Sequence, residues 1–102
     1  MSADLGSRFY NMEGEQIDRA EWLTLFEHPT ARQVALTERD DVMVSTVLLT
    51  IDHNWTGNGP PIIFETMIFG GEHDQYQERY ATKAEAEEGH DRAVSLALGD
   101  AP

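Results

Sequence analysis

Residues 42–51 read VMVSTVLLTI and residues 62–69 read IIFETMIF, and these two stretches decide the fold. Both are rich in β-branched and aromatic residues, and Glu65 is their only charged residue. The loop HNWTGNGPP, residues 53–61, separates them with Asn, Gly and Pro. We therefore predict two neighbouring strands, 42–52 and 62–69, at the centre of a sheet. Because both faces of the first strand are largely apolar, we expect it to be covered on both sides.

Two weaker strands flank this pair. Residues 32–38 alternate between apolar and polar side chains, and residues 76–81 place two tyrosines on one face. The connections are short, and short connections favour antiparallel pairing of consecutive strands. The sequence thus predicts an antiparallel meander of strands 32–38, 42–52, 62–69 and 76–81.

Two helices complete the expected fold, at about 18–27 and 83–98. Asp18 and Thr82 are each followed three residues later by Glu, which is the pattern of a capping box. Pro29 ends the first helix and Gly99 ends the second. A stripe of small residues (Ala86, Gly89, Ala93, Ala97) lets the second helix lie close to a sheet or receive an aromatic ring. We expect one α+β domain spanning 1–102, with two helices packed on the sheet and residues 1–7 as a loose terminus.

The charge of the chain restricts its partners. With 19 acidic and seven basic residues the net charge is −12, so nucleic-acid backbones and anionic membranes are repelled, whereas a basic protein is attracted. The absence of cysteine excludes disulfides and thiolate metal sites. Because the first eight residues contain no apolar signal segment, we expect the protein in the cytoplasm.

Four residues are candidates for catalysis, although no known catalytic motif occurs. Asp52 and His53 form a carboxylate–imidazole pair at a strand end, but adjacent strand residues point to opposite faces. Glu65 stands in a core strand, with His90 and Arg79 as possible neighbours. The alternatives are polar residues that mark a strand end, an ion-paired Glu65, and a partly buried His90 with satisfied hydrogen bonds. We therefore assign no catalytic residue, metal or cofactor.

Two surfaces are candidates for protein binding. Trp55 lies in the 53–61 loop, where it is either an exposed interface anchor or folded back over the core. Glu87, Glu88 and Asp91 crowd one arc of the last helix. The sequon Asn54–Thr56 is most simply a coincidence in a cytoplasmic protein.

The segments VSTVLLTIDHNW…GNGPPIIFETMIFGG, from Val44, and ERYATKAEAEEGHDRAV, from Glu78, resemble a group of small proteins in actinobacterial phages and prophages. The likeness extends to RFYNMEGEQID near the N-terminus. The resemblance implies a phage-encoded protein that acts in the cytoplasm of an infected bacterium. It implies no activity.

These observations favour a non-enzymatic phage accessory protein that binds a host or phage protein through its acidic surface or the Trp55 loop. A sharper form of this hypothesis is a nucleic-acid mimic. One alternative is a small metal-binding or hydrolytic module that uses Asp52, His53, Glu65 or His90. Another is a homo-oligomeric structural component, such as a homodimer, because two helices are few for the two faces of four strands.

Overall fold

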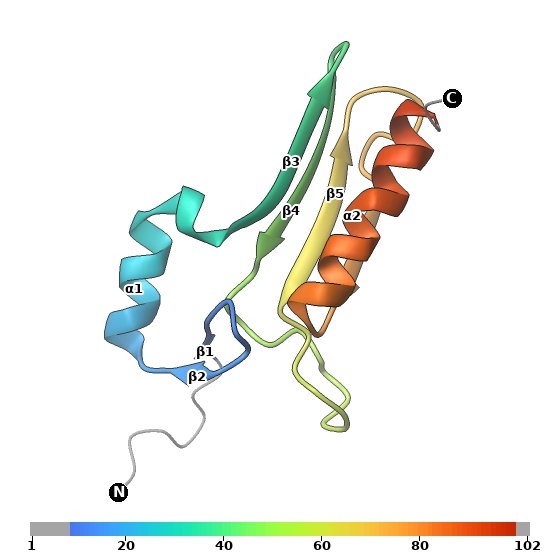
Figure 1. The fold of residues 1–102 in the computed structure, drawn as a ribbon. Coiled ribbons are helices and arrows are strands. Elements are labelled where there is room, and N and C mark those ends of the chain that lie inside the picture. The colour runs from blue at the N-terminus through green and yellow to red at the C-terminus, as the bar shows by residue number, and fades with distance from the viewer. Residues whose placement is uncertain (1–8, 100–102) are drawn as a thin grey trace, which may run out of the picture.

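The computed structural model describes residues 9–99, so the predicted loose terminus, residues 1–7, lies outside the described part. Within residues 9–99 a small hairpin and a helix precede a four-stranded sheet, and a long helix follows it (Figure 1). The elements, in chain order, are β1 (Phe9–Tyr10), β2 (Gln16–Ile17), α1 (Arg19–Glu27), η1 (Pro29–Arg32), β3 (Gln33–Arg39), β4 (Val42–Leu48), β5 (Phe64–Phe69), β6 (Gln77–Tyr80) and α2 (Lys83–Leu98).

The larger sheet has the order β3-β4-β5-β6 with antiparallel neighbours, which confirms the predicted meander and the α+β fold. The turn between β3 and β4 consists of Asp40 and Asp41, both with positive φ, as a tight two-residue hairpin requires. β4 ends at Leu48, four residues before the predicted end, because the chain leaves the sheet near Thr50, whose φ is 70°. Ile51 instead bridges Phe9 of the hairpin.

Helix α2 packs along one face of the sheet (Figure 1). Its start is fixed by the predicted capping box between Thr82 and Glu85. The expected use of the small-residue stripe is confirmed, since Gly89 is buried against the ring of Tyr80. The core residues form two clusters, which are Leu48, Ile63, Phe64, Tyr80 and Ala86 in one, and Val44, Ile68 and Ala93 in the other.

The prediction that β4 is covered on both sides is wrong. Burial alternates along this strand: Val44, Thr46 and Leu48 are buried, while the side chains between them are only half-buried. β5 alternates in the same way. The physical reason is that α2, the helix that runs along the sheet, covers one face of it, while α1 reaches the core at one end through the half-buried Leu25. We call the surface opposite α2 the open face.

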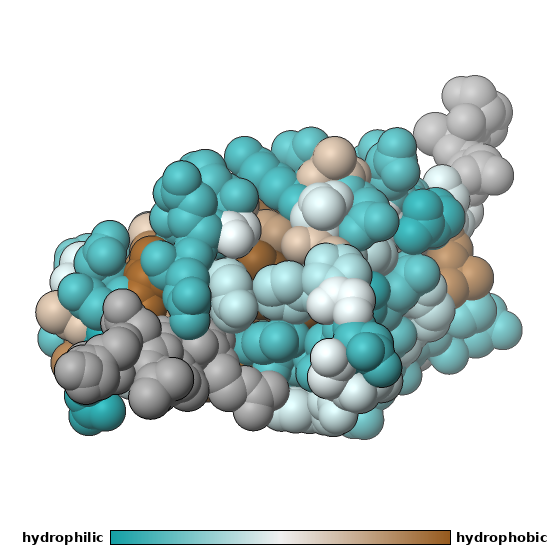
Figure 2. Space-filling view, turned by 90° about the horizontal axis from the view of Figure 1, so that it is seen from below, coloured by the Kyte–Doolittle hydropathy of each residue, from teal (hydrophilic) through white to brown (hydrophobic). Residues whose placement is uncertain are grey.

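Helix α1 lies beside the sheet and contacts β1 and η1 (Figure 1). Asp18 caps it by accepting a hydrogen bond from the Glu21 amide at 2.9 Å, as predicted. The Trp22 ring stacks on Phe9 with centroids 4.6 Å apart, and its indole N–H donates to the Thr50 hydroxyl at 2.9 Å. No residue of α1 is buried. The end of the molecule that carries α1 is at the left in Figures 1 and 2, and apolar atoms are visible there in Figure 2.

Candidate functional site

The 53–61 loop is closed at its base by Asp52. One carboxylate oxygen of Asp52 accepts hydrogen bonds from the backbone amides of Asn54, at 2.7 Å, and of Ile62, at 3.0 Å. These two amides flank the loop, so a single side chain ties its beginning to its end. The geometry assigns Asp52 a structural contact that the sequence did not predict.

Asn54 orders the interior of the same loop. Its side-chain amide donates to the carbonyls of Asn58, at 2.6 Å, and Pro60, at 2.9 Å. Its side-chain oxygen accepts from the amide and the hydroxyl of Thr56, at 3.1 and 2.6 Å. One side chain therefore fixes three separate points of the loop.

Trp55 projects from this ordered loop and is 66% exposed. Of the two positions that the sequence left open, the structure places Trp55 in the exposed one. Its ring centroid lies 5.4 Å from that of His53, and the His53 ring nitrogen Nδ1 lies 2.8 Å from the Ile51 carbonyl. His53 thus helps to support the tryptophan.

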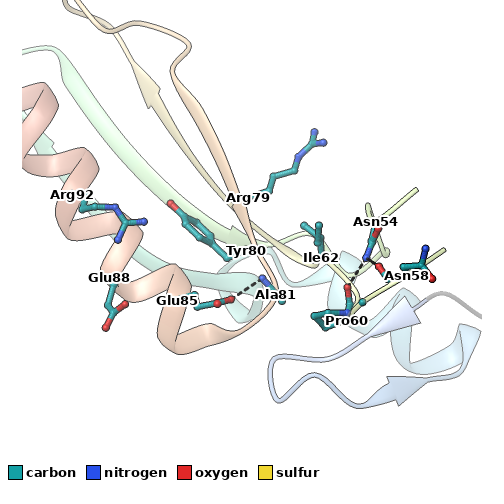
Figure 3. A pocket seen from close by; sticks show the side chains of 11 residues that line it. Asn54, Asn58, Pro60, Ile62, Arg79, Tyr80, Ala81, Glu85, Glu88 and Arg92 are labelled. Atoms are coloured by element: carbon teal, nitrogen blue, oxygen red, sulfur yellow. Dashed lines mark hydrogen bonds between the residues drawn. The ribbon is translucent and has the colours of Figure 1, made fainter. Parts of the chain in front are cut away.

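An open hollow of about 450 Å³ lies between this loop and α2 (Figure 3). Loop residues Asn54, Asn58 and Pro60 line one side, and Glu85, Glu88 and Arg92 line the helical side. Figure 2 shows the molecule from the end that carries the loop, where hydrophilic atoms dominate and apolar atoms appear in gaps between them. The hollow makes the tryptophan loop and part of the acidic helix neighbours, which the sequence did not show.

The side chains around the hollow differ in how firmly they are held. Glu85 accepts hydrogen bonds from the amides of Ala81 and Thr82, at 3.2 and 3.1 Å, and is part of the helix cap. Arg92 contacts the Glu78 carboxylate at 3.4 Å. Burial raises the pKa of Tyr80 to about 12, and the neighbouring Glu78 carboxylate acts in the same direction. Tyr80 is therefore a neutral hydroxyl at physiological pH.

The three acids predicted to form one binding arc are all exposed, but they do not face one place. Glu88 borders the hollow beside the tryptophan loop. Asp91 borders a different hollow, next to Thr37 and Arg39 on β3. Of Glu87, Glu88 and Asp91, the structure therefore brings only Glu88 to the rim of the loop hollow.

Two of the catalytic candidates, Glu65 and His90, lie on opposite faces of the sheet. Glu65 is on the open face, where its carboxylate accepts from Arg79 Nε at 3.0 Å and from Gln77 at 2.6 Å. The prediction that Arg79 is a neighbour of Glu65 is confirmed, whereas the prediction that His90 is a neighbour of Glu65 is wrong. The reason is the alternation of β5, which turns Thr66 toward α2 and Glu65 away from it.

His90 is 4% exposed and both of its ring nitrogens are engaged. Nε2 lies 2.9 Å from the Thr37 hydroxyl, and Nδ1 lies 2.7 Å from the Thr46 hydroxyl, which in turn lies 2.6 Å from that of Thr66. Burial lowers the pKa of His90, and the nearby charge of Asp91 opposes this effect. A neutral imidazole thus joins α2 to the sheet. The three threonines were missed, and the available signal was their inward position on three strands opposite the histidine.

No group of three or more His, Asp or Glu residues within 9–99 is arranged to hold a metal ion. Asp52 and His53 serve the loop, Glu65 is ion-paired, and His90 is enclosed by threonines. What the described residues do bring together is an ordered loop with an exposed indole and a shallow hollow whose rim carries both carboxylates and arginines.

Comparisons with protein families, with curated proteins and with solved structures found no match to this chain. Over residues 9–99, no helix has the length and apolar character needed to cross a membrane.

Proposed function

We propose that this protein is a non-catalytic phage accessory factor that binds a basic segment of a host or phage protein in the cytoplasm of the infected bacterium. The observation that carries the proposal is Trp55, which is 66% exposed on a loop ordered by Asn54. A rigid, exposed tryptophan is a favourable interface anchor, because binding buries a large apolar area and orders little additional chain. The phage setting rests on the resemblance of residues 44–71 and 78–94.

The basic character of the partner follows from the net charge of the chain, which is −12. The hollow beside the loop is lined by two glutamates and two arginines. Both arginines contact carboxylates, Arg79 that of Glu65 and Arg92 that of Glu78, and Glu85 caps the helix, so the exposed Glu88 is the group best placed to meet a cation. An arginine or lysine of a partner could enter this hollow, meet the carboxylate, and place its stem against Tyr80. A cation near the face of Trp55 would gain a further attraction of about 0.5–1 kcal/mol. Long-range attraction by the acidic surface would also raise the association rate.

A non-catalytic role is supported by the separation of the acid–base candidates. Asp52 closes the loop, and Glu65 and His90 stand on opposite faces of the sheet. General acid–base chemistry needs its groups within reach of the same substrate atoms.

The test is retention of proteins from an actinobacterial lysate on the immobilised chain, at low and at high salt. The wild type is expected to retain a basic protein at low salt and to release it as salt rises, because screening weakens charge attraction. Trp55→Ala is expected to weaken that interaction by about 2 kcal/mol, or about 30-fold. Its folding stability should hardly change, because the side chain is exposed.

Phe26→Ala is the matched control, since Phe26 is an exposed aromatic side chain (49%) on α1, away from the loop. It should retain the partner as the wild type does. An empty wild-type column at low salt, or equal retention by Trp55→Ala and wild type, would contradict the proposal.

A further inference from the structure

The open face of the sheet carries a continuous group of apolar side chains. In the register of the sheet, Met43 pairs with Phe69, and Ser45 pairs with both Leu36 and Met67. Directly paired residues point to the same face, so these side chains form one surface. Leu36 is 41% exposed and Phe69 is 39% exposed. The apolar members are Leu36, Met43, Val47, Met67 and Phe69.

The size of this face is that of an interaction surface. Four strands about 4.8 Å apart, each contributing about six residues, span about 19 Å by 20 Å, or about 400 Å² of projected area. The face also carries polar side chains such as Ser45 and Gln77, so its apolar part is smaller than this area. An exposed apolar patch that polar residues surround often marks a binding site on a monomer. The two methionines also suit a surface that must adapt to a partner, because their side chains are unbranched and flexible.

The charges on the open face differ from those of the rest of the chain. Three charged residues share it: Glu65 and Arg79, which form an ion pair at 3.0 Å, and Glu38, whose strand partner is Met43. The face therefore carries a net charge of −1, within a chain of −12. Glu38 and Arg79 lie at diagonally opposite corners, since they belong to the two edge strands and to opposite ends of the sheet.

We propose that the open face is covered by a second copy of this chain, which packs face to face about a two-fold axis. The commonest symmetric assembly joins the same surface on two copies, and that surface must then be self-complementary. We place the two-fold axis in the plane of the interface, along the diagonal of the open face that joins the two corners without Glu38 or Arg79. Rotation about this axis exchanges the Glu38 corner with the Arg79 corner. It places Glu38 of each copy over the partner's Arg79, so that two ion pairs flank an apolar centre.

The size and charge of the face predict a weak dimer. Together the two faces cover about 800 Å² in projection, which is less than the roughly 1,200 Å² that the smallest stable interfaces bury, so the dimer belongs to the weak class and a dissociation constant in the micromolar range or weaker is expected. Each copy carries −12, and the two copies repel each other at long range. Added salt screens this repulsion, so dimerisation should strengthen as salt rises.

The experiment is sedimentation velocity of the full chain, from about 5 to about 500 µM, at about 50 and 500 mM NaCl. A dimer fraction that rises with both concentration and salt is expected. Leu36→Glu should weaken the dimer at least tenfold, because it buries an unpaired charge in each half of the apolar centre. Leu96→Glu is the matched control, since Leu96 is 42% exposed but lies on α2, and it should dimerise like the wild type.

A second pair of variants tests the proposed ion pair between Glu38 and Arg79 of the second copy, with substitutions at exposed positions. Glu38→Lys and Glu72→Lys both replace an exposed acid and reduce the repulsion between copies equally. Glu38→Lys should weaken the dimer, because it faces the partner's Arg79, whereas Glu72→Lys, in the turn before β6, should strengthen it. Equal effects would overturn the proposed arrangement.

A chain that stays monomeric at every concentration and salt would overturn the proposal, as would a Leu36→Glu variant that dimerises like the wild type. These results are independent of the proposed function. Trp55→Ala should leave the dimer unchanged, and binding of a basic protein should weaken, not strengthen, as salt rises.

Discussion

Replacing Gly89 with alanine tests how closely α2 lies on the sheet. A Cβ atom at this position would fall well inside van der Waals contact with the hydroxyl and ring of Tyr80. The ring cannot simply move aside, because Tyr80 is 7% exposed and packs among Leu48, Phe64 and Ala86. Its hydroxyl also donates to the Glu78 carboxylate at 3.1 Å.

The expected cost is about 2 kcal/mol. Overpacking of a filled core costs up to about 3 kcal/mol. Alanine in a helix interior stabilises the helix by about 1 kcal/mol relative to glycine, which offsets part of this cost. For a domain of this size, the net loss corresponds to a fall in melting temperature of about 10 °C.

The assay measures the free energy of unfolding in urea for four proteins: the wild type, Gly89→Ala, Tyr80→Leu and the double variant. In the Tyr80→Leu background the alanine should be neutral, or stabilising by up to about 1 kcal/mol, because the overlapping ring is gone. If Gly89→Ala alone stabilises the protein, as at an exposed helical glycine, then α2 does not lie on Tyr80 as described.

Two other predictions concern the buried histidine and the loop. Because burial lowers the pKa of His90 below its ordinary value of 6.5, the neutral ring stabilises the fold above that pH, and the stability is lost as the pH falls through the lowered folded-state pKa. The free energy of unfolding in urea, measured from about pH 7 down to about pH 5, should therefore fall less steeply for His90→Gln than for the wild type. Equal slopes would contradict the conclusion that His90 is held neutral in the folded protein. Asn54→Ala should lower the fluorescence anisotropy of Trp55 and weaken partner binding, because the loop loses its internal hydrogen bonds. An unchanged anisotropy would show that the loop is ordered by other contacts.

The strand order and the helix ends could be predicted because their causes are local. Asp18 and Thr82 cap the residues that follow them, and Gly89 leaves space that a neighbouring ring fills. The end of β4 and the one-sided coverage of the sheet could not be predicted in the same way. Apolar residues such as Met43 and Val47 indicate burial, but they do not say whether the same chain or a second copy provides it.

The candidate site was predicted less well, because its contacts join distant parts of the chain. The sequence makes Asp52 either a candidate for an acid–base pair or a polar residue that marks a strand end, and neither interpretation predicts that its carboxylate spans the loop to the amide of Ile62. His90 contacts threonines 53 and 44 residues away, on β3 and β4. The alternation of β5 then decides that Glu65 cannot join it. The polar composition of the loop predicted a surface position for residues 53–61, but it left open whether Trp55 is exposed or folded back, and the structure shows it exposed.

The central claim is that the sheet has one face covered by α2 and one face open to a partner. Methyl NMR with a soluble paramagnetic agent tests it directly, with Met43 and Met67 as probes of the open face and Ile68 as a probe of the covered face. In dilute protein the two methionine methyls should be strongly broadened and Ile68 should not, and high concentration and salt should protect the methionines. Methionine methyls that are shielded as fully as Ile68 in dilute, monomeric protein would contradict the account.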